Sequence, residues 1–216
     1  MKRFFLTRLL ILCLACALPG WPALAADEAP DALISRITQD ALDTLQTDSA
    51  VQSGDVARIT LLMDKKVMPY INFLRMTSSA VGPAWRQATP DQRQRLEAEF
   101  KTLLVRTYAG AMSQARKLTF SVKPLRASPE DKEVIVRTVI KGHGDPVQLD
   151  YRLERTPGDG AGWKIYNLNV LGVWLVDTYR SQFAQEINAK GLDGLISTLT
   201  ERNKSNAAGS AKPVKG

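Results

Sequence analysis

Residues 147–154 read VQLDYRLE, and residues 134–140 read VIVRTVI. In the first stretch, apolar residues at odd positions alternate with polar residues at even positions, which is the period of a half-buried β-strand. The second stretch consists mostly of β-branched residues, which are typical of strands. The connection at residues 141–146 is short and contains two glycines and a proline. The two stretches therefore predict adjacent antiparallel strands.

Two further stretches complete the predicted sheet. Residues 118–122 read LTFSV and alternate in the same way, and residues 163–170 read WKIYNLNV after the turn-rich connector PGDGAG. Short strands joined by turn-rich connectors indicate antiparallel hairpins. We therefore expect a four-stranded antiparallel sheet over residues 117–170.

The rest of the chain has helical periodicity. Before the sheet, helices are predicted at residues 31–48, from 56 to about 69, and at 70–81 and 90–116; after it, helices are predicted at residues 176–190 and 193–202. The helix at residue 90 has the clearest start, because Thr89 is a suitable N-cap, Pro90 stands at the first position and Gln92 completes a capping box. Gly191 is expected to separate the last two helices. Helices on one face of a curved antiparallel sheet define an α+β fold.

The first 25 residues have the layout of a secretory signal peptide. Lys2, Arg3 and Arg8 precede an apolar run at residues 9–18, and Ala23-Leu24-Ala25 offers small residues before a cleavage point at Ala26. Both cysteines lie in this segment, so the mature chain has no cysteine for a disulfide or a metal site. Residues 26–202 are predicted to form one domain with a helical part at 31–116, and residues 203–216 a disordered tail.

The net charge of +7 is uneven along the chain. The predicted signal peptide and the predicted tail each hold three cationic residues and no acid, which leaves only +1 for residues 26–202. Such a body excludes a dedicated nucleic-acid-binding protein. Within it, residues 26–64 carry −6 and residues 65–126 carry +9. This segregation fits either plain solvated helix faces or a docking surface for lipid headgroups or acidic proteins.

No catalytic or cofactor motif stands out. The chain has no glycine-rich phosphate loop and no dinucleotide fingerprint, and its one histidine, His143, is expected in a solvated turn. Asp150 alternates with Leu149 and Tyr151 and is expected to face solvent. No metal ligand set and no cofactor are predicted. The apolar run at residues 170–176 fits either a buried crossing of the core or one wall of a hydrophobic cavity.

Several stretches, in this order and spacing, carry a family resemblance. They are VMPYINF at 67–73, WRQATPDQR at 85–93, FKTLLVRTY at 100–108, GWKIYN at 162–167, GVWLV at 172–176, YRSQF at 179–183 and GLDGL at 191–195. Together they resemble the MlaC, or toluene-tolerance, family of periplasmic phospholipid-binding proteins. Two departures are Asn167, where the family often has Asp, and Trp174, where it often has a small Ser.

The resemblance implies an NTF2-like or cystatin-like fold with an internal hydrophobic cavity for acyl tails. It also implies a monomeric periplasmic carrier with three partners: phospholipid, an inner-membrane ABC transporter complex with MCE domains, and an outer-membrane lipoprotein–porin complex. The apolar residues expected to line the cavity are Phe73, Met76, Phe100, Leu104, Tyr108, Val136, Leu149, Tyr151, Trp163, Ile165, Val173, Leu175, Tyr179 and Phe183.

Three alternatives stay open at this point. The chain could be an exported structural or adaptor protein whose apolar residues form only a core. It could carry another lipid, such as a hopanoid or a polyisoprenoid, because an apolar cavity discriminates poorly among tails. It could also be an enzyme on a ketosteroid-isomerase-like scaffold with Asp150 or Asp177 as base.

Overall fold

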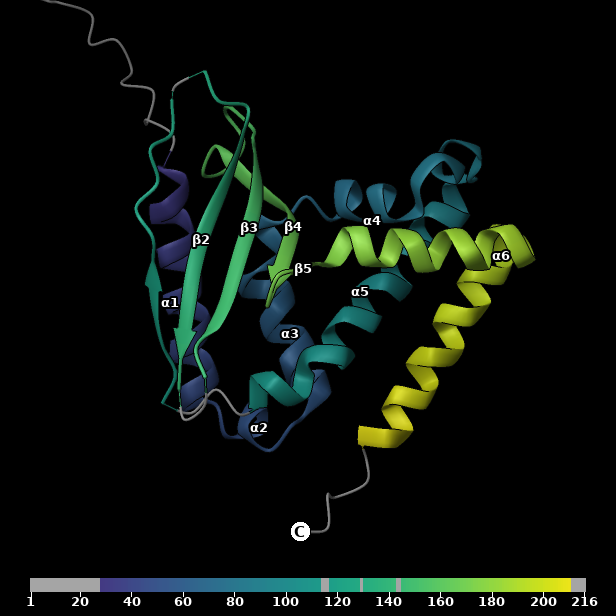
Figure 1. Ribbon diagram of the computed structural model, residues 1–216. Helices are drawn as coiled ribbons and strands as arrows, with labels where there is room; N and C mark the ends of the chain where they lie inside the picture. The colour runs from purple at the N-terminus through teal and green to yellow at the C-terminus, as the bar shows by residue number, and fades with distance from the viewer. Residues whose placement is uncertain (1–27, 114–116, 129, 143–144, 211–216) are drawn as a thin grey trace, which may run out of the picture.

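The computed structural model describes residues 28–113, 117–128, 130–142 and 145–210, with side chains to residue 206. The predicted signal peptide and His143 lie outside the described residues, as do the last six residues of the predicted tail. Figure 1 shows the sheet and α1 on one side of the molecule and the helices α4 to α6 on the other.

Helices form nearly where the sequence predicts them. Among the described residues they are α1 (Pro30–Thr47), α2 (Ser49–Gln52), α3 (Val56–Lys66), α4 (Phe73–Val81), α5 (Pro90–Ser113) and α6 (Leu175–Ser210), with 3-10 turns η1 (Met68–Tyr70) and η2 (Gly82–Gln87). The short α2 was not predicted. The predicted helix 70–81 begins only at Phe73, because Asn72 is its N-cap and accepts a hydrogen bond from Arg75 N at 2.9 Å.

The capping box that starts α5 is confirmed. Thr89 N donates to Gln92 Oε1 at 3.0 Å, and Gln92 N donates to Thr89 Oγ1 at 3.2 Å. The two hydrogen bonds satisfy backbone donors that the first turn of a helix leaves free. The sequence signal at this helix start therefore corresponds to real contacts.

The sheet is antiparallel and has five strands rather than four. Its order is β1 (Thr119–Val122), β2 (Glu133–Lys141), β3 (Val147–Arg155), β4 (Trp163–Val170) and β5 (Val173–Trp174). The unpredicted β5 uses part of the apolar run at residues 170–176 and pairs Val173 with Val170. The α+β fold with a curved sheet is otherwise as expected.

A bulge in β4 decides which side chains share a face. Arg152 pairs with Asn167, but the next residue, Leu153, pairs with Ile165, so Tyr166 is an extra residue in β4. An extra residue reverses the alternation beyond it. The apolar face of β4 therefore continues from Ile165 to Leu168 and Val170, and not to the asparagines at 167 and 169.

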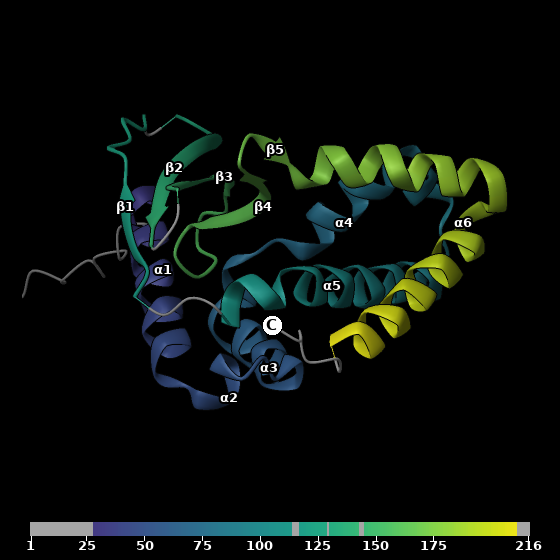
Figure 2. The ribbon, with the colours of Figure 1, turned by 60° about the horizontal axis from the view of Figure 1, so that its bottom comes forward.

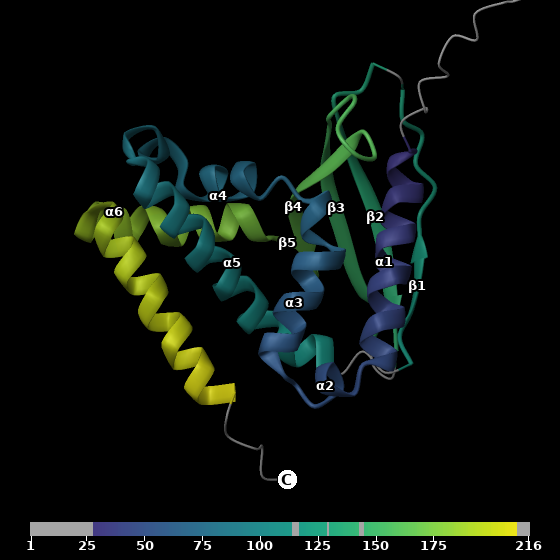
Figure 3. The same ribbon diagram turned by 180° about the vertical axis from the view of Figure 1, so that it is seen from behind.

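Two cores lie on the apolar face of the sheet. The first, which we call the α1 core, packs Leu33, Ile34 and Ile37 of α1 against sheet residues that include Val136 and Leu153. In Figure 3, α1 lies across the front of the sheet with α3 beside it. The second, the aromatic core, lies among α4, α5 and α6, which run alongside one another in Figure 2. Ile71 is the partly buried residue that packs against both cores.

The expectation that Asp150 faces solvent is wrong. Asp150 does lie on the sheet face opposite to Leu149 and Tyr151, but only 6% of it is exposed. Its Oδ2 accepts a hydrogen bond from Gln148 Nε2 at 2.9 Å and lies 4.0 Å from Arg137 Nε. Alternation predicts the face of a side chain, whereas neighbouring side chains on that face decide whether water reaches it.

The predicted disordered tail is also wrong at its start, because α6 continues to Ser210. Asn203 is 4% exposed, and its Nδ2 donates to Glu99 O at 3.0 Å and to Glu99 Oε2 at 2.6 Å. Arg106 in turn donates to the Asn203 carbonyl. These contacts with α5 hold a polar segment that composition alone predicts to be unstructured.

The prediction that Gly191 separates the last two helices is confirmed: α6 consists of two helical arms, which meet at an angle in Figure 1, with a non-helical Gly191 between them. Gly191 has φ 70° and ψ −175°, a backbone conformation that residues other than glycine rarely adopt. We therefore expect Gly191→Ala to lower the free energy of unfolding by about 1–3 kcal/mol. The measurement is chemical denaturation of the purified protein.

Gly110 provides the matched control, since it lies within α5 with no atom within 4 Å of an added Cβ. Gly110→Ala is expected to raise the free energy of unfolding by about 0.5–1 kcal/mol. Equal effects of the two substitutions would contradict a conformational role for Gly191.

Candidate functional site

The aromatic core is built around Phe100 of α5, which is fully buried. Its ring centroid lies 4.9 Å from that of Tyr179 and 5.3 Å from that of Phe183, both edge to face, and 5.8 Å from that of Phe73. Edge-to-face pairs at these distances are favourable beyond the burial of their area. Met76 and Leu175 complete this centre, so α4, α5 and α6 all contribute to it.

The predicted cavity residues divide between the two cores. Phe73, Met76, Phe100, Leu104, Tyr108, Leu175, Tyr179 and Phe183 belong to the aromatic core or pack against it, whereas Val136, Tyr151, Trp163 and Ile165 belong to the α1 core or pack against it. Leu149 is half-buried and pairs with Val170, and Val173 is 51% exposed on β5. The predicted residues therefore fall into two clusters rather than one. Their part in binding a lipid stays a prediction.

Ten partly buried apolar residues pack against the aromatic core. Five of them, which we call the rim, are Phe73, Leu104, Tyr108, Leu168 and Val170. They pack against the buried centre and keep part of their apolar surface accessible. The first three are among the predicted residues, and the two from β4 were missed. A signal for them was present in WKIYNLNV, where apolar residues move from odd to even positions in the middle of the strand.

The tyrosines of the aromatic core sit in apolar surroundings. Burial raises the pKa of the Tyr108 phenol, and the nearby Tyr179 adds to that rise. Burial likewise raises the pKa of the Tyr179 phenol. Both phenols are therefore neutral near pH 7, and the core carries no charge from them.

A polar junction joins the start of α4 to the sheet. Ile71 forms a bridge to Ile165, and Asn72 N donates to Ile165 O at 2.8 Å. The Asn72 side chain donates to Glu154 Oε1 at 2.6 Å. Residues 71–72 therefore attach Ile71, which contacts both cores, to β4 and β3.

Arg75 extends this junction to a third strand. Its guanidinium donates to Glu154 Oε2 and to Glu133 Oε1, each at 2.5 Å, and lies 3.7 Å from the ring centroid of Tyr166. The Tyr166 hydroxyl also donates to Glu133 at 2.9 Å. Charge-assisted hydrogen bonds of this kind are stronger than neutral ones. Arg75 thus holds α4 against β2 and β3 at once.

The two residues that depart from the family pattern lie on the opposite face of the sheet. Arg152 lies 4.0 Å from the ring centroid of Trp174 and makes an ion pair with Asp177 at 3.5 Å. Asn167 is buried, and its Oδ1 accepts hydrogen bonds from Leu168 N at 2.9 Å and Val176 N at 3.1 Å. Asn167 therefore satisfies a free amide in the first turn of α6, a role open to an aspartate as well.

Two pockets in the described structure have charged side chains in their lining. One has a volume of about 540 Å³ and is lined by Arg75, Glu133 and Glu154 among others; the second, of about 270 Å³, lies between α4, η2 and α6. No cluster of metal-binding side chains occurs among the described residues. In the same part of the chain, no helix has the length and apolar character needed to cross a membrane.

The Arg75 junction makes stability depend on pH. The hydrogen bond from Arg75 holds the pKa of the Glu133 carboxyl below its usual value of about 4.3, although desolvation opposes this. A carboxyl with a lowered pKa stabilises the fold above its unfolded-state pKa and loses that effect as the pH falls through the folded value. Between about pH 5 and pH 3, the free energy of unfolding should fall more steeply in the wild type than in Glu133→Gln.

Glu97 gives a control of opposite sign, because burial raises the pKa of its carboxyl. Its protonation partly offsets the loss of stability in acid, so Glu97→Gln should make the acid loss steeper than in the wild type. Denaturation curves at a series of pH values measure both effects. Parallel pH profiles for wild type and Glu133→Gln would contradict the role assigned to the junction.

Comparison with known proteins places this fold in a family. The family model described as MlaC protein matches residues 35–201. A toluene tolerance protein, ttg2D, of Pseudomonas putida is 30% identical over 108 residues, but that match spans only 50% of this chain and 49% of the relative. The intermembrane phospholipid transport system binding protein MlaC of Haemophilus influenzae is 19% identical over 82% of this chain and 83% of that protein.

A solved structure agrees with these sequence matches. A phospholipid-binding protein from Ralstonia solanacearum, solved in complex with a phospholipid, superposes with a TM-score of 0.78 and is 41% identical. The match covers 82% of this chain and 98% of that one. Since the family model spans most of the chain and the fold agrees, the chain belongs to the MlaC family.

Proposed function

We propose that this protein is a phospholipid carrier that holds acyl tails against the rim of its aromatic core. The observation that carries the proposal is the likeness, at 41% identity, to a protein solved with a phospholipid bound. The rim supports it, because Phe73, Leu104 and Tyr108 from the helices and Leu168 and Val170 from the sheet present apolar surface toward a common cluster.

The division into two cores supports uptake of tails. The aromatic core and the α1 core are separate clusters, and Ile71 packs against both. A close-packed core leaves no room for tails, so we place their space at the boundary between the two cores. The tails would then lie between the helical cluster and β4, along Leu168 and Val170.

The energetics of a lipid tail require such enclosure. At about 0.8 kcal/mol per methylene, a 16-carbon tail exposed to water costs roughly 12 kcal/mol. Spontaneous release into water would therefore be very slow. Transfer then depends on docking to a partner that receives the tails as they leave the protein.

The family suggests the partners and the compartment. We propose that the mature chain, after cleavage near Ala25, acts as a monomer in the periplasm. There it would move phospholipid between an outer-membrane lipoprotein–porin complex and an inner-membrane ABC transporter complex with MCE domains, and so maintain the asymmetry of the outer membrane. Neither catalysis nor a cofactor is part of this proposal.

The direct test is native mass spectrometry of the mature protein purified from a periplasm without detergent. A stoichiometric adduct of phospholipid mass would support the carrier. A hopanoid or polyisoprenoid adduct would show that the protein carries a different lipid. Bare, folded protein that takes up no lipid from vesicles would contradict the proposal and favour an exported adaptor.

A substitution at the rim tests where the tails bind. Leu104→Asp places a charge among apolar side chains and should reduce bound phospholipid at least tenfold, because a buried carboxylate without a partner is strongly unfavourable. Lipid bound per protein is measured by extraction and mass spectrometry, with circular dichroism to confirm folding. If Leu104→Asp does not fold, Leu168→Gln makes the same test from the sheet side.

Leu61→Asp is the matched control. Leu61 lies on α3 and is 61% exposed, away from the aromatic core. The control should keep the lipid content of the wild type. Normal lipid content in a folded rim variant would refute the position assigned to the tails.

A further inference from the structure

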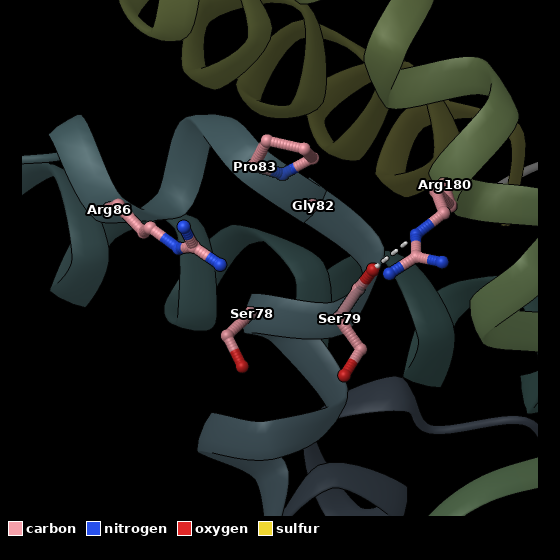
Figure 4. Close-up of a pocket in the computed structure, with 6 residues that line it drawn as sticks. All are labelled: Ser78, Ser79, Gly82, Pro83, Arg86 and Arg180. Carbon is pink, nitrogen blue, oxygen red and sulfur yellow. Dashed lines mark hydrogen bonds between the residues drawn. The ribbon is translucent and has the colours of Figure 1, made fainter.

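The smaller of the two pockets has a cationic lining. It has a volume of about 270 Å³ and lies where α4 ends, η2 begins and α6 passes. Its lining residues are Ser78, Ser79, Gly82, Pro83, Arg86 and Arg180. In Figure 4 the two arginines flank the pocket from opposite sides, and the serines lie between them. None of the lining residues is acidic, so the pocket brings two positive charges together without a carboxylate.

Arg180 is oriented but not neutralised. Its Nε donates to the backbone carbonyl of Ser79 at 3.0 Å, the dashed contact in Figure 4, which directs the guanidinium of α6 toward the end of α4. Its Nη groups make no hydrogen bond or ion pair with any described residue. An arginine whose Nε is bonded and whose Nη groups are unbonded can donate those remaining N–H groups to an oxyanion.

The Arg86 guanidinium likewise has no hydrogen bond or ion pair among the described side chains, and it points toward the middle of the pocket. Gly82 has φ 72°, and a Cβ there would lie 3.8 Å from Arg180 Nε. Glycine therefore suits the turn, whereas a Cβ would make only an ordinary contact with the guanidinium. The Ser79 hydroxyl, which has no partner in the described structure, adds a donor to the lining.

The pocket adjoins the aromatic core. Ser78 and Ser79 directly precede Ala80 and Val81 in α4, and Arg180 directly follows Tyr179 in α6. Ala80, Val81 and Tyr179 are buried in the aromatic core. The cationic pocket thus lies on the outer side of the contact between α4 and α6, and the aromatic core lies on its inner side. A group held in the pocket would therefore lie beside buried residues of the aromatic core, at the end of α4 opposite to the rim residue Phe73.

We propose that this pocket binds a phosphate group, namely the phosphodiester of the carried lipid's headgroup. That the phosphate belongs to a carried lipid rests on the proposed carrier function, whereas the preference for a phosphate rests on the residues of the pocket. Paired guanidinium groups with a hydroxyl donor match the tetrahedral oxygens of a phosphate. The same chemistry would fit a free phosphate ester, so the experiment separates the two sources.

The test offers the protein phosphatidylglycerol and diacylglycerol with the same acyl chains and measures each lipid bound per protein by mass spectrometry. Arg86→Gln/Arg180→Gln removes both guanidinium groups. Lys123→Gln/Arg126→Gln removes two exposed positive charges between β1 and β2 as a control. We expect wild type and control to prefer the phospholipid. In the pocket variant, the preference for the phospholipid should fall about tenfold, while diacylglycerol should still bind. A tenfold loss corresponds to one or more charge-assisted hydrogen bonds.

The outcomes separate the two proposals. An unchanged preference in the pocket variant, with both lipids bound, would overturn the headgroup site and leave the carrier function intact. Uptake of neither lipid by the wild type would refute the carrier function. In that case, titration with glycerol 3-phosphate decides: binding lost in the pocket variant supports a site for free phosphate esters, and no binding in the wild type overturns the phosphate site.

Discussion

The attachment of α4 to the sheet is the constraint on which the rest of the structure depends. Asn72 and Arg75 make hydrogen bonds to Ile165, Glu154 and Glu133, which lie on three different strands. These contacts orient the helix that carries Phe73 and Met76 into the aromatic core. They also fix where that core begins relative to the α1 core, because Ile71 lies between the two. The junction thereby fixes the position of α4 relative to the sheet.

This arrangement is consistent with the proposed carrier. Of the two candidate bases, Asp150 lies on the sheet face opposite to the aromatic core, near Arg137. Asp177, in the first turn of α6, makes an ion pair with Arg152. The face that could receive a ligand carries apolar side chains, with a cationic pocket at the outer side of the helices. The rim offers the apolar surface that acyl tails require. The division into two cores separates the rigid attachment from the region where tails would enter.

Much of the fold could be predicted from local patterns, and the errors occur where distant residues meet. The helix at Pro90 and the break at Gly191 depend on residues a few positions apart, so their sequence signals were reliable. The burial of Asp150 and Asn203 depends on contacts with other elements. Asn203, for example, is held by Glu99, 104 positions earlier in the chain. Of the rim residues, Phe73, Leu104 and Tyr108 were predicted, and Leu168 and Val170 were missed because the bulge at Tyr166 reverses the alternation.

The sequence by itself determined the α+β order, the antiparallel meander, the start of α5 and the family, because periodicity, caps and ordered motifs are properties of neighbouring residues. Only the tertiary structure decided which apolar residues meet in the aromatic core, and that Arg75 bridges two strands. It likewise decided that Arg86 and Arg180 flank one pocket, although 94 positions separate them in the chain. The physical reason is that burial and charge pairing depend on contacts between elements, and no local pattern specifies which distant element will supply the partner.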